Sequence, residues 1–249
     1  MPGLTETILK LPILKRLYPS LRKRWAEIFW KDGFAVVRSN GALFLVNHRN
    51  FVDRQIAFYG DYEAEQTAYL TTAMGEHGCD MFLDIGANIG LYSIRAVMAG
   101  HAKRTVAFEP DPRNRNQFAA NILMNGLTDR IEVDPHAVSN RSGPVGFTFF
   151  PETSTGQSRV DESGGTASVE AVRIDDVIDL KDGTIFAKID IEGHEAAAVE
   201  GMAETIKANR VFLQIESFPD QLENLSNLLT SHGFTRRHGI GDDHFFANF

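Results

Sequence analysis

Four acidic side chains stand at the ends of short apolar runs, where a buried strand would meet solvent. They are Asp84, Glu109, Asp190 and Glu216. Each run has the length and composition of a strand inside a parallel sheet that is covered on both faces. In an open α/β sheet, ligands bind in the crevice at the carboxyl ends of the strands. We therefore expect these four carboxylates to converge on one site.

The first of these acids precedes a glycine-rich turn, because residues 81–90 read MFLDIGANIG and residues 91–99 have helical length and spacing. A strand, glycine turn and helix in this order bring backbone N–H groups and a helix N-terminus up to a ligand. Neither the dinucleotide fingerprint nor the P-loop fits this turn. A carboxylate at the strand end instead favours a ligand with an amine or a cation, such as S-adenosylmethionine. The residues expected to hold it are Asp84, Gly86, Ala87, Asn88 and Gly90.

The second acid lies where a nucleoside would need it. Glu109 ends the next apolar run, 25 residues after Asp84. An acid at the end of the second strand, roughly 20 residues past the glycine turn, hydrogen-bonds ribose hydroxyls in nucleotide-binding folds. The alternative is an ordinary strand-end acid that faces solvent. Pro110 follows Glu109, and Ala137 and Val138 follow the third predicted strand, so we expect these residues to complete the site around the ribose and adenine.

The second acidic cluster offers bases for chemistry on a hydroxyl group. Asp190, Glu192 and His194 follow one strand, and Glu216 ends the next. Any of them could accept a substrate proton, although a structural role is the alternative for His194. The cluster could equally hold a hard cation such as Mg²⁺. We favour a site without metal, because no tight acid–acid pair stands at either strand end.

The elements that position these residues form a regular series. Strands alternate with helices, which predicts an α/β fold with a doubly wound, mostly parallel, Rossmann-like sheet of seven strands whose C-terminal strands are antiparallel. Residues 151–168 are rich in Ser, Thr and Gly and predict a loop, a candidate lid over the site. An N-terminal helix and a β-hairpin around Asn40-Gly41 precede the sheet. We expect an N-terminal extension of residues 1–60 and a catalytic domain of residues 61–249.

Composition limits the functional classes. The chain has 249 residues, a net charge of −8 and one cysteine, Cys79. The acidic balance argues against a nucleic-acid partner, and the lone cysteine predicts a reducing, cytoplasmic location. Residues 1–31 differ, because they carry a charge of +5 and leave −13 for the remainder. Their leucines and Trp25 recur at helical spacing. This pattern fits a helix packed on the domain, a helix that makes weak contact with an anionic membrane surface, or a helix that holds a phosphorylated substrate.

The motifs together resemble the FkbM family of S-adenosylmethionine-dependent methyltransferases. The resemblance covers about residues 50–220, and its most specific part is Lys188-Ile-Asp-Ile-Glu-Gly. It implies transfer of a methyl group to oxygen, commonly a hydroxyl of a sugar or polyketide, and it implies that Glu65 also contacts the cofactor. At position 194 the family often has a small residue where this chain has histidine. The other matching pieces are Tyr62-Glu63-Ala64-Glu65, residues 83–90, Phe108-Glu109-Pro110 and Ile174-Asp175-Asp176.

We therefore predict an O-methyltransferase that acts on a hydroxyl of a sugar, glycolipid or secondary metabolite. One alternative is an N-methyltransferase acting on protein or nucleic acid, but the polar-Pro-Pro-aromatic turn typical of nucleobase enzymes is absent after Ile189. Another is a module that binds the cofactor without catalysis. The acceptor's identity and the choice between monomer and homodimer stay open.

Overall fold

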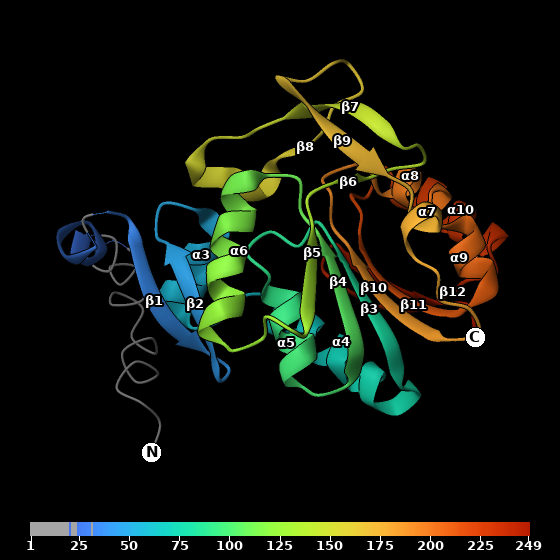
Figure 1. Ribbon diagram of the computed structural model, residues 1–249, viewed down its shortest axis with the longest axis horizontal. Helices are drawn as coiled ribbons and strands as arrows, with labels where there is room; N and C mark the ends of the chain where they lie inside the picture. The colour runs from blue at the N-terminus through green and yellow to red at the C-terminus, as the bar shows by residue number, and fades with distance from the viewer. Residues whose placement is uncertain (1–19, 21–23, 31) are drawn as a thin grey trace. The chain divides into compact units, whose positions relative to one another are not determined.

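A computed structural model describes residues 20, 24–30 and 32–249 of the chain (Figure 1). The chain divides into two compact units, one within residues 1–62 and one spanning residues 63–249. Most of the expected basic N-terminal helix lies outside the described residues, although residues 24–29 are helical.

The first unit contains the predicted hairpin and one helix that the sequence analysis missed. β1 (Phe34–Ser39) and β2 (Ala42–Asn47) pair antiparallel. The turn between them has Asn40 and Gly41 at φ +46° and +87°, the left-handed conformation that a two-residue hairpin turn requires. α3 (Phe51–Tyr59) was not predicted, yet its signals were present. The Asn50 side chain caps its first turn, and Gly60 ends it in the left-handed conformation.

The second unit is built on a seven-stranded sheet in the order β12-β13-β11-β10-β3-β4-β5. The five strands from β11 to β5 run parallel, and β13 joins β11 antiparallel. This arrangement confirms the expected Rossmann-like fold with antiparallel C-terminal strands. The bounds are β3 (Cys79–Ile85), β4 (Ala102–Phe108), β5 (Ile131–Asp134), β10 (Thr184–Ile189), β11 (Arg210–Glu216), β12 (Thr235–Ile240) and β13 (Asp243–Ala247).

Helices cover both faces of this sheet, which explains why its central strands read as apolar runs. α4 (Ala64–His77) and α5 (Leu91–Met98) pack on one face around Phe82, Phe186 and Phe212. The other face carries α7 (Ile174–Val177), α8 (Glu195–Glu200), α9 (Ala203–Ala208) and α10 (Leu222–Ser231), while α6 (Pro112–Met124) links β4 to β5.

Two short helices connect β10 to β11. α8 ends at Glu200 and α9 begins at Ala203. Between them the main chain at Gly201 lies against Ser139, so a Cβ at this position would stand 2.0 Å from the Ser139 carbonyl oxygen. The absence of a side chain at Gly201 thus lets the chain pass close to the end of β6.

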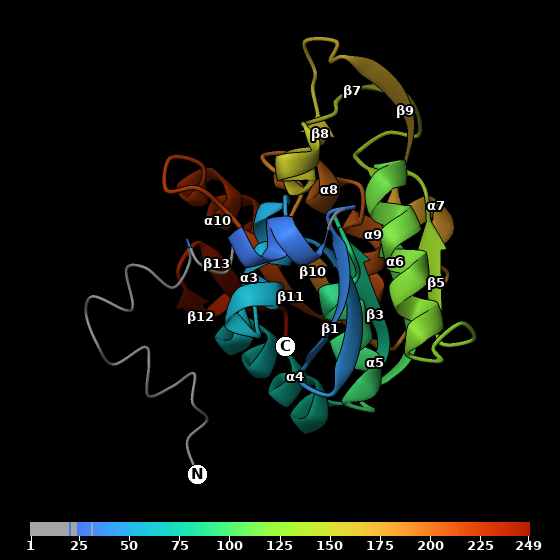
Figure 2. The ribbon, with the colours of Figure 1, turned by 90° about the vertical axis from the view of Figure 1, so that its left-hand side faces the viewer.

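A second, smaller sheet has the order β6-β9-β7-β8 and is seen at the top of Figure 1 and again in Figure 2. Its strands are β6 (Ala137–Val138), β7 (Gly143–Thr148), β8 (Arg159–Val160) and β9 (Ala167–Val172). The segment 151–168, predicted as a loop, contains a 3₁₀ helix, η1 (Glu152–Gln157), followed by β8. This segment lines the cavity described below, and its role as a lid stays a prediction.

Candidate active site

The glycine turn after β3 is shaped by close packing against the main chain and an aromatic ring. Gly86 has φ +84°, and a Cβ there would lie 1.9 Å from the Asp190 carbonyl oxygen. Gly90 has φ +83°, and a Cβ there would lie 1.9 Å from the Phe118 ring. Any larger residue would push the turn away from the end of β10 or from α6. The turn is thereby held close to Asp190.

Glu109 binds this turn to the start of α6. Its buried carboxylate accepts the Asn88 N–H at 2.7 Å on one oxygen and the Asp111 N–H at 2.8 Å on the other. Burial raises the pKa of Glu109 to about 7, and the two N–H donors oppose that shift. The side chain is therefore partly protonated near neutral pH in the absence of a ligand.

A cavity of about 50 Å³ lies beside Glu109. Among the predicted cofactor residues, Gly86, Asn88, Glu109, Pro110, Ala137, Val138 and Asp190 line it. The rest of the wall includes Thr155, Gly156, Ser158, Arg159 and Val160 from η1 and β8. The segment that carries η1 and β8 therefore forms one wall of the cavity in which we expect the nucleoside.

Asp84 contacts α5 rather than the cavity. Its Oδ2 accepts the Ser93 N–H at 2.9 Å and the Ser93 hydroxyl at 2.6 Å, and its side chain is buried. These bonds satisfy donors in the first turn of α5, as a capping carboxylate does. Burial raises the pKa of Asp84. The carboxylate thus fixes the helix that follows the glycine turn, and its direct contact with a ligand stays a prediction.

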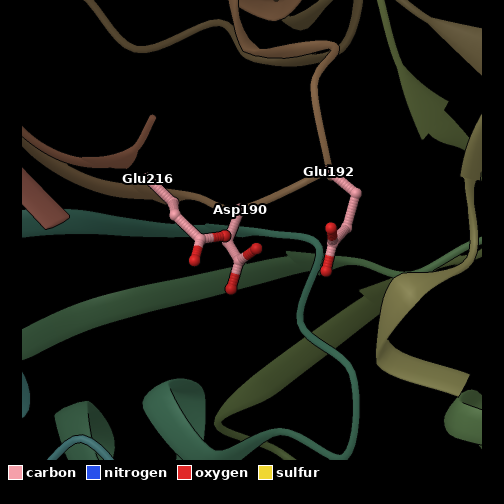
Figure 3. A group of neighbouring side chains, drawn as sticks. All are labelled: Asp190, Glu192 and Glu216. Carbon is pink, nitrogen blue, oxygen red and sulfur yellow. The ribbon is translucent and has the colours of Figure 1, made fainter. Parts of the chain in front are cut away.

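Asp190, Glu192 and Glu216 form an acidic group at the carboxyl ends of β10 and β11. Figure 3 shows Asp190 between the other two side chains. One carboxylate oxygen from each lies within 4.8 Å of the others. Ile189 and Ile215 pair in register on neighbouring parallel strands, which brings the acids at the strand ends together. Glu192 joins them from a left-handed turn, with φ +59°.

The three carboxyl groups differ in protonation because they share one small space. Asp190 and Glu216 are hydrogen-bonded to each other, so one of them carries the proton. Burial and the charge of Asp190 raise the pKa of Glu216 to about 10. The same two causes raise the pKa of Glu192 to about 7. The metal-free site was predicted because neither strand end carries an acid pair by itself. In the structure an acid pair forms across the ends of two neighbouring strands.

Lys188 explains why Asp190 is the ionised member of the pair. Burial opposes ionisation of Asp190, but the Lys188 ammonium donates to its Oδ2 at 2.5 Å and lowers its pKa. Lys188 is buried at 4% exposure within β10 and lies 4.6 Å from the centre of the Tyr92 ring. Lys188 was not among the predicted site residues. A lysine within an apolar strand is nevertheless a signal, since lysine is rarely buried without a partner.

Glu63 interacts electrostatically with Lys188 and was also not among the predicted site residues. Its Oε2 accepts the Tyr92 hydroxyl at 2.8 Å, and the Lys188 charge favours its ionised form although burial raises its pKa. Glu65, the residue predicted to contact the cofactor, is exposed on the first turn of α4. Of the two glutamates in Tyr62-Glu63-Ala64-Glu65, it is therefore Glu63 that hydrogen-bonds to Tyr92 and interacts with the charge of Lys188.

His194 serves the turn between β10 and α8. Its Nε2 lies 2.9 Å from the Ser139 hydroxyl, and burial lowers its pKa, so the ring is neutral at pH 7. Next to it, Glu195 Oε1 accepts the N–H groups of Ile191 and Gly193. Both side chains hold the loop that carries Glu192, which agrees with the structural alternative for His194.

Comparisons with known proteins were made on the whole sequence and fold. A family model described as the methyltransferase FkbM domain matches residues 84–236. The chain is 25% identical over 191 residues to the 31-O-demethyl-FK506 methyltransferase FkbM of Streptomyces tacrolimicus, covering 63% of this chain and 73% of that protein. It is 29% identical over 91 residues to methyltransferase sdnD of Sordaria araneosa, covering 36% of this chain and 35% of that one.

The fold is similar to a crystal structure of a methyltransferase FkbM from Methylobacillus flagellatus. The TM-score is 0.52 and the sequence identity 20%, and the match covers 79% of this chain and 59% of the other. At this identity the similarity concerns the fold alone.

Proposed function

Because this chain belongs to the FkbM family of methyltransferases, we propose that it transfers the methyl group of S-adenosylmethionine to a hydroxyl group of a small molecule or glycan. One observation supports this most: an ionised carboxylate, Asp190, is paired with Lys188 and lines the same cavity as Glu109. The Streptomyces tacrolimicus relative is named for methylation of an oxygen of a small molecule, which points in the same direction.

The residues of the cavity fit the cofactor. Glu109 offers a buried carboxylate for the ribose hydroxyls, and Ala137 and Val138 offer an apolar wall for adenine. Asn88 Oδ1 is buried without a hydrogen-bond partner among the described residues, which is costly unless a ligand donor meets it. When bound, S-adenosylmethionine supplies an electrophilic methyl group on its sulfonium.

Asp190 would act as the base that accepts the proton of the acceptor hydroxyl. An alcohol has a pKa far above 7, so a positioned base is needed as transfer proceeds. Lys188 keeps Asp190 ionised, and Asp190 is still 27% exposed, so a substrate can reach it. Glu216 already holds a proton and is hydrogen-bonded to Asp190, so it orients the base rather than competing for the substrate proton.

The acidic group could also hold a divalent cation, since Mg²⁺ prefers oxygen ligands. The buried Lys188 ammonium favours the metal-free form. It lies 2.5 Å from Asp190 Oδ2 and already balances that charge. A cation placed on the same oxygen would meet this ammonium at short range, and the repulsion would weaken binding.

The proposal is tested by a search for the acceptor. The enzyme is incubated with trideuteromethyl-labelled S-adenosylmethionine and a metabolite extract of the source cells, and products are identified by mass spectrometry. We expect a product that carries the label on oxygen and that is missing with Asp190→Asn but present with Glu204→Gln, a change at an exposed acid of α9. A label found on nitrogen, or an equal yield from Asp190→Asn, would contradict the proposal.

A further inference from the structure

An exposed apolar face lies on the helical residues 24–29. Trp25, Ile28 and Phe29 stand at positions i, i+3 and i+4, and they are 50%, 63% and 64% exposed. These three residues share one side of a helix, and the Trp25 and Phe29 rings lie 4.9 Å apart. We call them the Trp25 face. Ala26 between them is fully buried, so the helix presents its small residue to the protein and its large ones to the outside.

This helix is anchored in the first unit by its last aromatic residue. The Trp30 ring lies 5.9 Å from the His48 ring and 6.2 Å from the Phe58 ring. The Trp25 face is therefore attached to the hairpin and to α3 and keeps its outward direction. The large exposed hydrophobic residues of the described chain also concentrate here, with seven of eleven in the first unit: Trp25, Ile28, Phe29, Phe34, Val36, Phe51 and Tyr59.

The sequence next to this face is basic. Residues 1–31 carry seven basic and two acidic side chains, a net +5, whereas the remainder of the chain carries −13. Within the described helix Arg24 and Glu27 balance each other, so the excess positive charge belongs to the flanking sequence. Aromatic side chains next to a basic stretch of sequence favour the interface of an anionic membrane, with the rings at headgroup depth. Each basic residue near such a surface adds to the attraction.

We propose that the Trp25 face docks the protein onto the surface of an anionic phospholipid bilayer. None of the described helices has the length and apolarity to cross a bilayer. A second copy fits less well, because a symmetric contact through this face would bring two basic segments together. The inference rests on the first unit alone and does not depend on the methyl acceptor.

The test uses tryptophan fluorescence, because Trp25 and Trp30 are the two tryptophans of the chain. In Trp30→Phe, Trp25 is the sole emitter. We expect its emission to shift to the blue, and to be quenched by brominated acyl chains, on vesicles of phosphatidylcholine with one-third phosphatidylglycerol. Vesicles of phosphatidylcholine alone should give a much smaller response. Added salt should weaken binding to the anionic vesicles, since it screens the charges.

Substitutions on the Trp25 face distinguish specific membrane binding from nonspecific hydrophobic adsorption to vesicles. Ile28→Ser with Phe29→Ser should weaken vesicle binding in flotation by on the order of tenfold or more, as expected for losing two inserted side chains. The matched control is Leu123→Ser, a 73% exposed leucine of α6 in the other unit, which should bind as the wild type does. Three results would overturn the proposal. They are Trp25 emission that is already blue-shifted without lipid, equal binding to both vesicle types, and a dimer of the wild type that is lost in the double variant.

Discussion

Replacing Lys188 by methionine tests how the protein keeps Asp190 ionised. Methionine keeps much of the side-chain volume but removes the ammonium that lies 2.5 Å from Asp190 Oδ2. A hydrogen bond to a charged group contributes about 1.5–3 kcal/mol, and about 1.4 kcal/mol corresponds to one pKa unit. Because Asp190 is 27% exposed, solvent screens part of this effect, and the lower end applies. We therefore expect the pKa of Asp190 to rise by roughly one unit.

The assay is the pH dependence of kcat for methyl transfer. Asp190 must be ionised to act, so activity falls as pH drops through its pKa, and in Lys188→Met this fall should occur roughly one unit higher. The loss should be largest in acid and should recover as pH rises. Lys207→Met, at an 80% exposed lysine of α9, is the matched control. Lys188→Arg keeps the charge and should retain the wild-type profile if it folds. An unchanged acidic limb in folded Lys188→Met with normal cofactor affinity would refute the role given to Lys188.

Three further predictions concern the cofactor, the acid pair and metal. Glu109→Gln should weaken S-adenosylmethionine binding on the order of 10- to 100-fold by calorimetry. Because the pKa of Glu109 is about 7, the affinity of the wild type should decrease as the pH is lowered through 7. The affinity of the variant should not change over this pH range. An affinity equal to that of the wild type would remove Glu109 from the ribose site. Glu216 has a pKa of about 10 against an ordinary 4.5, so the folded state retains a proton that the unfolded state releases, and stability should fall as pH rises through this window. Glu216→Gln cannot titrate, so its melting temperature should gain on the wild type as pH rises, whereas exposed Glu223→Gln should not. Turnover should survive EDTA, and activity that EDTA abolishes and Mg²⁺ restores would show a metal-dependent mechanism.

The elements with strong local signals were predictable. The Asn40-Gly41 turn sets its hairpin, and the runs before Asp84, Glu109, Asp190 and Glu216 are the central parallel strands. The carboxyl ends of parallel strands lie at one edge of a sheet, so the sequence predicted that these strand ends share a crevice. It did not predict the order of the strands.

The side-chain partners were harder to predict because they depend on packing between distant segments. Gly201 lies against Ser139 between α8 and α9, and no local pattern shows that contact. Glu63 and Glu65 are two residues apart, and only the direction of α4 decides which one reaches Tyr92. Asp84 was expected to face a ligand, but its carboxylate accepts hydrogen bonds from the N–H and the hydroxyl of Ser93 in the first turn of α5.

The central claim is that Asp190 removes the acceptor's proton at a site next to the bound cofactor. The most direct test is single-turnover transfer of labelled methyl from saturating S-adenosylmethionine to the identified acceptor, comparing wild type with Asp190→Asn in the presence of EDTA. We predict that the variant's rate falls on the order of 10²- to 10⁴-fold, the usual contribution of a general base, while its cofactor affinity stays within about twofold. A wild-type rate in Asp190→Asn would contradict the claim.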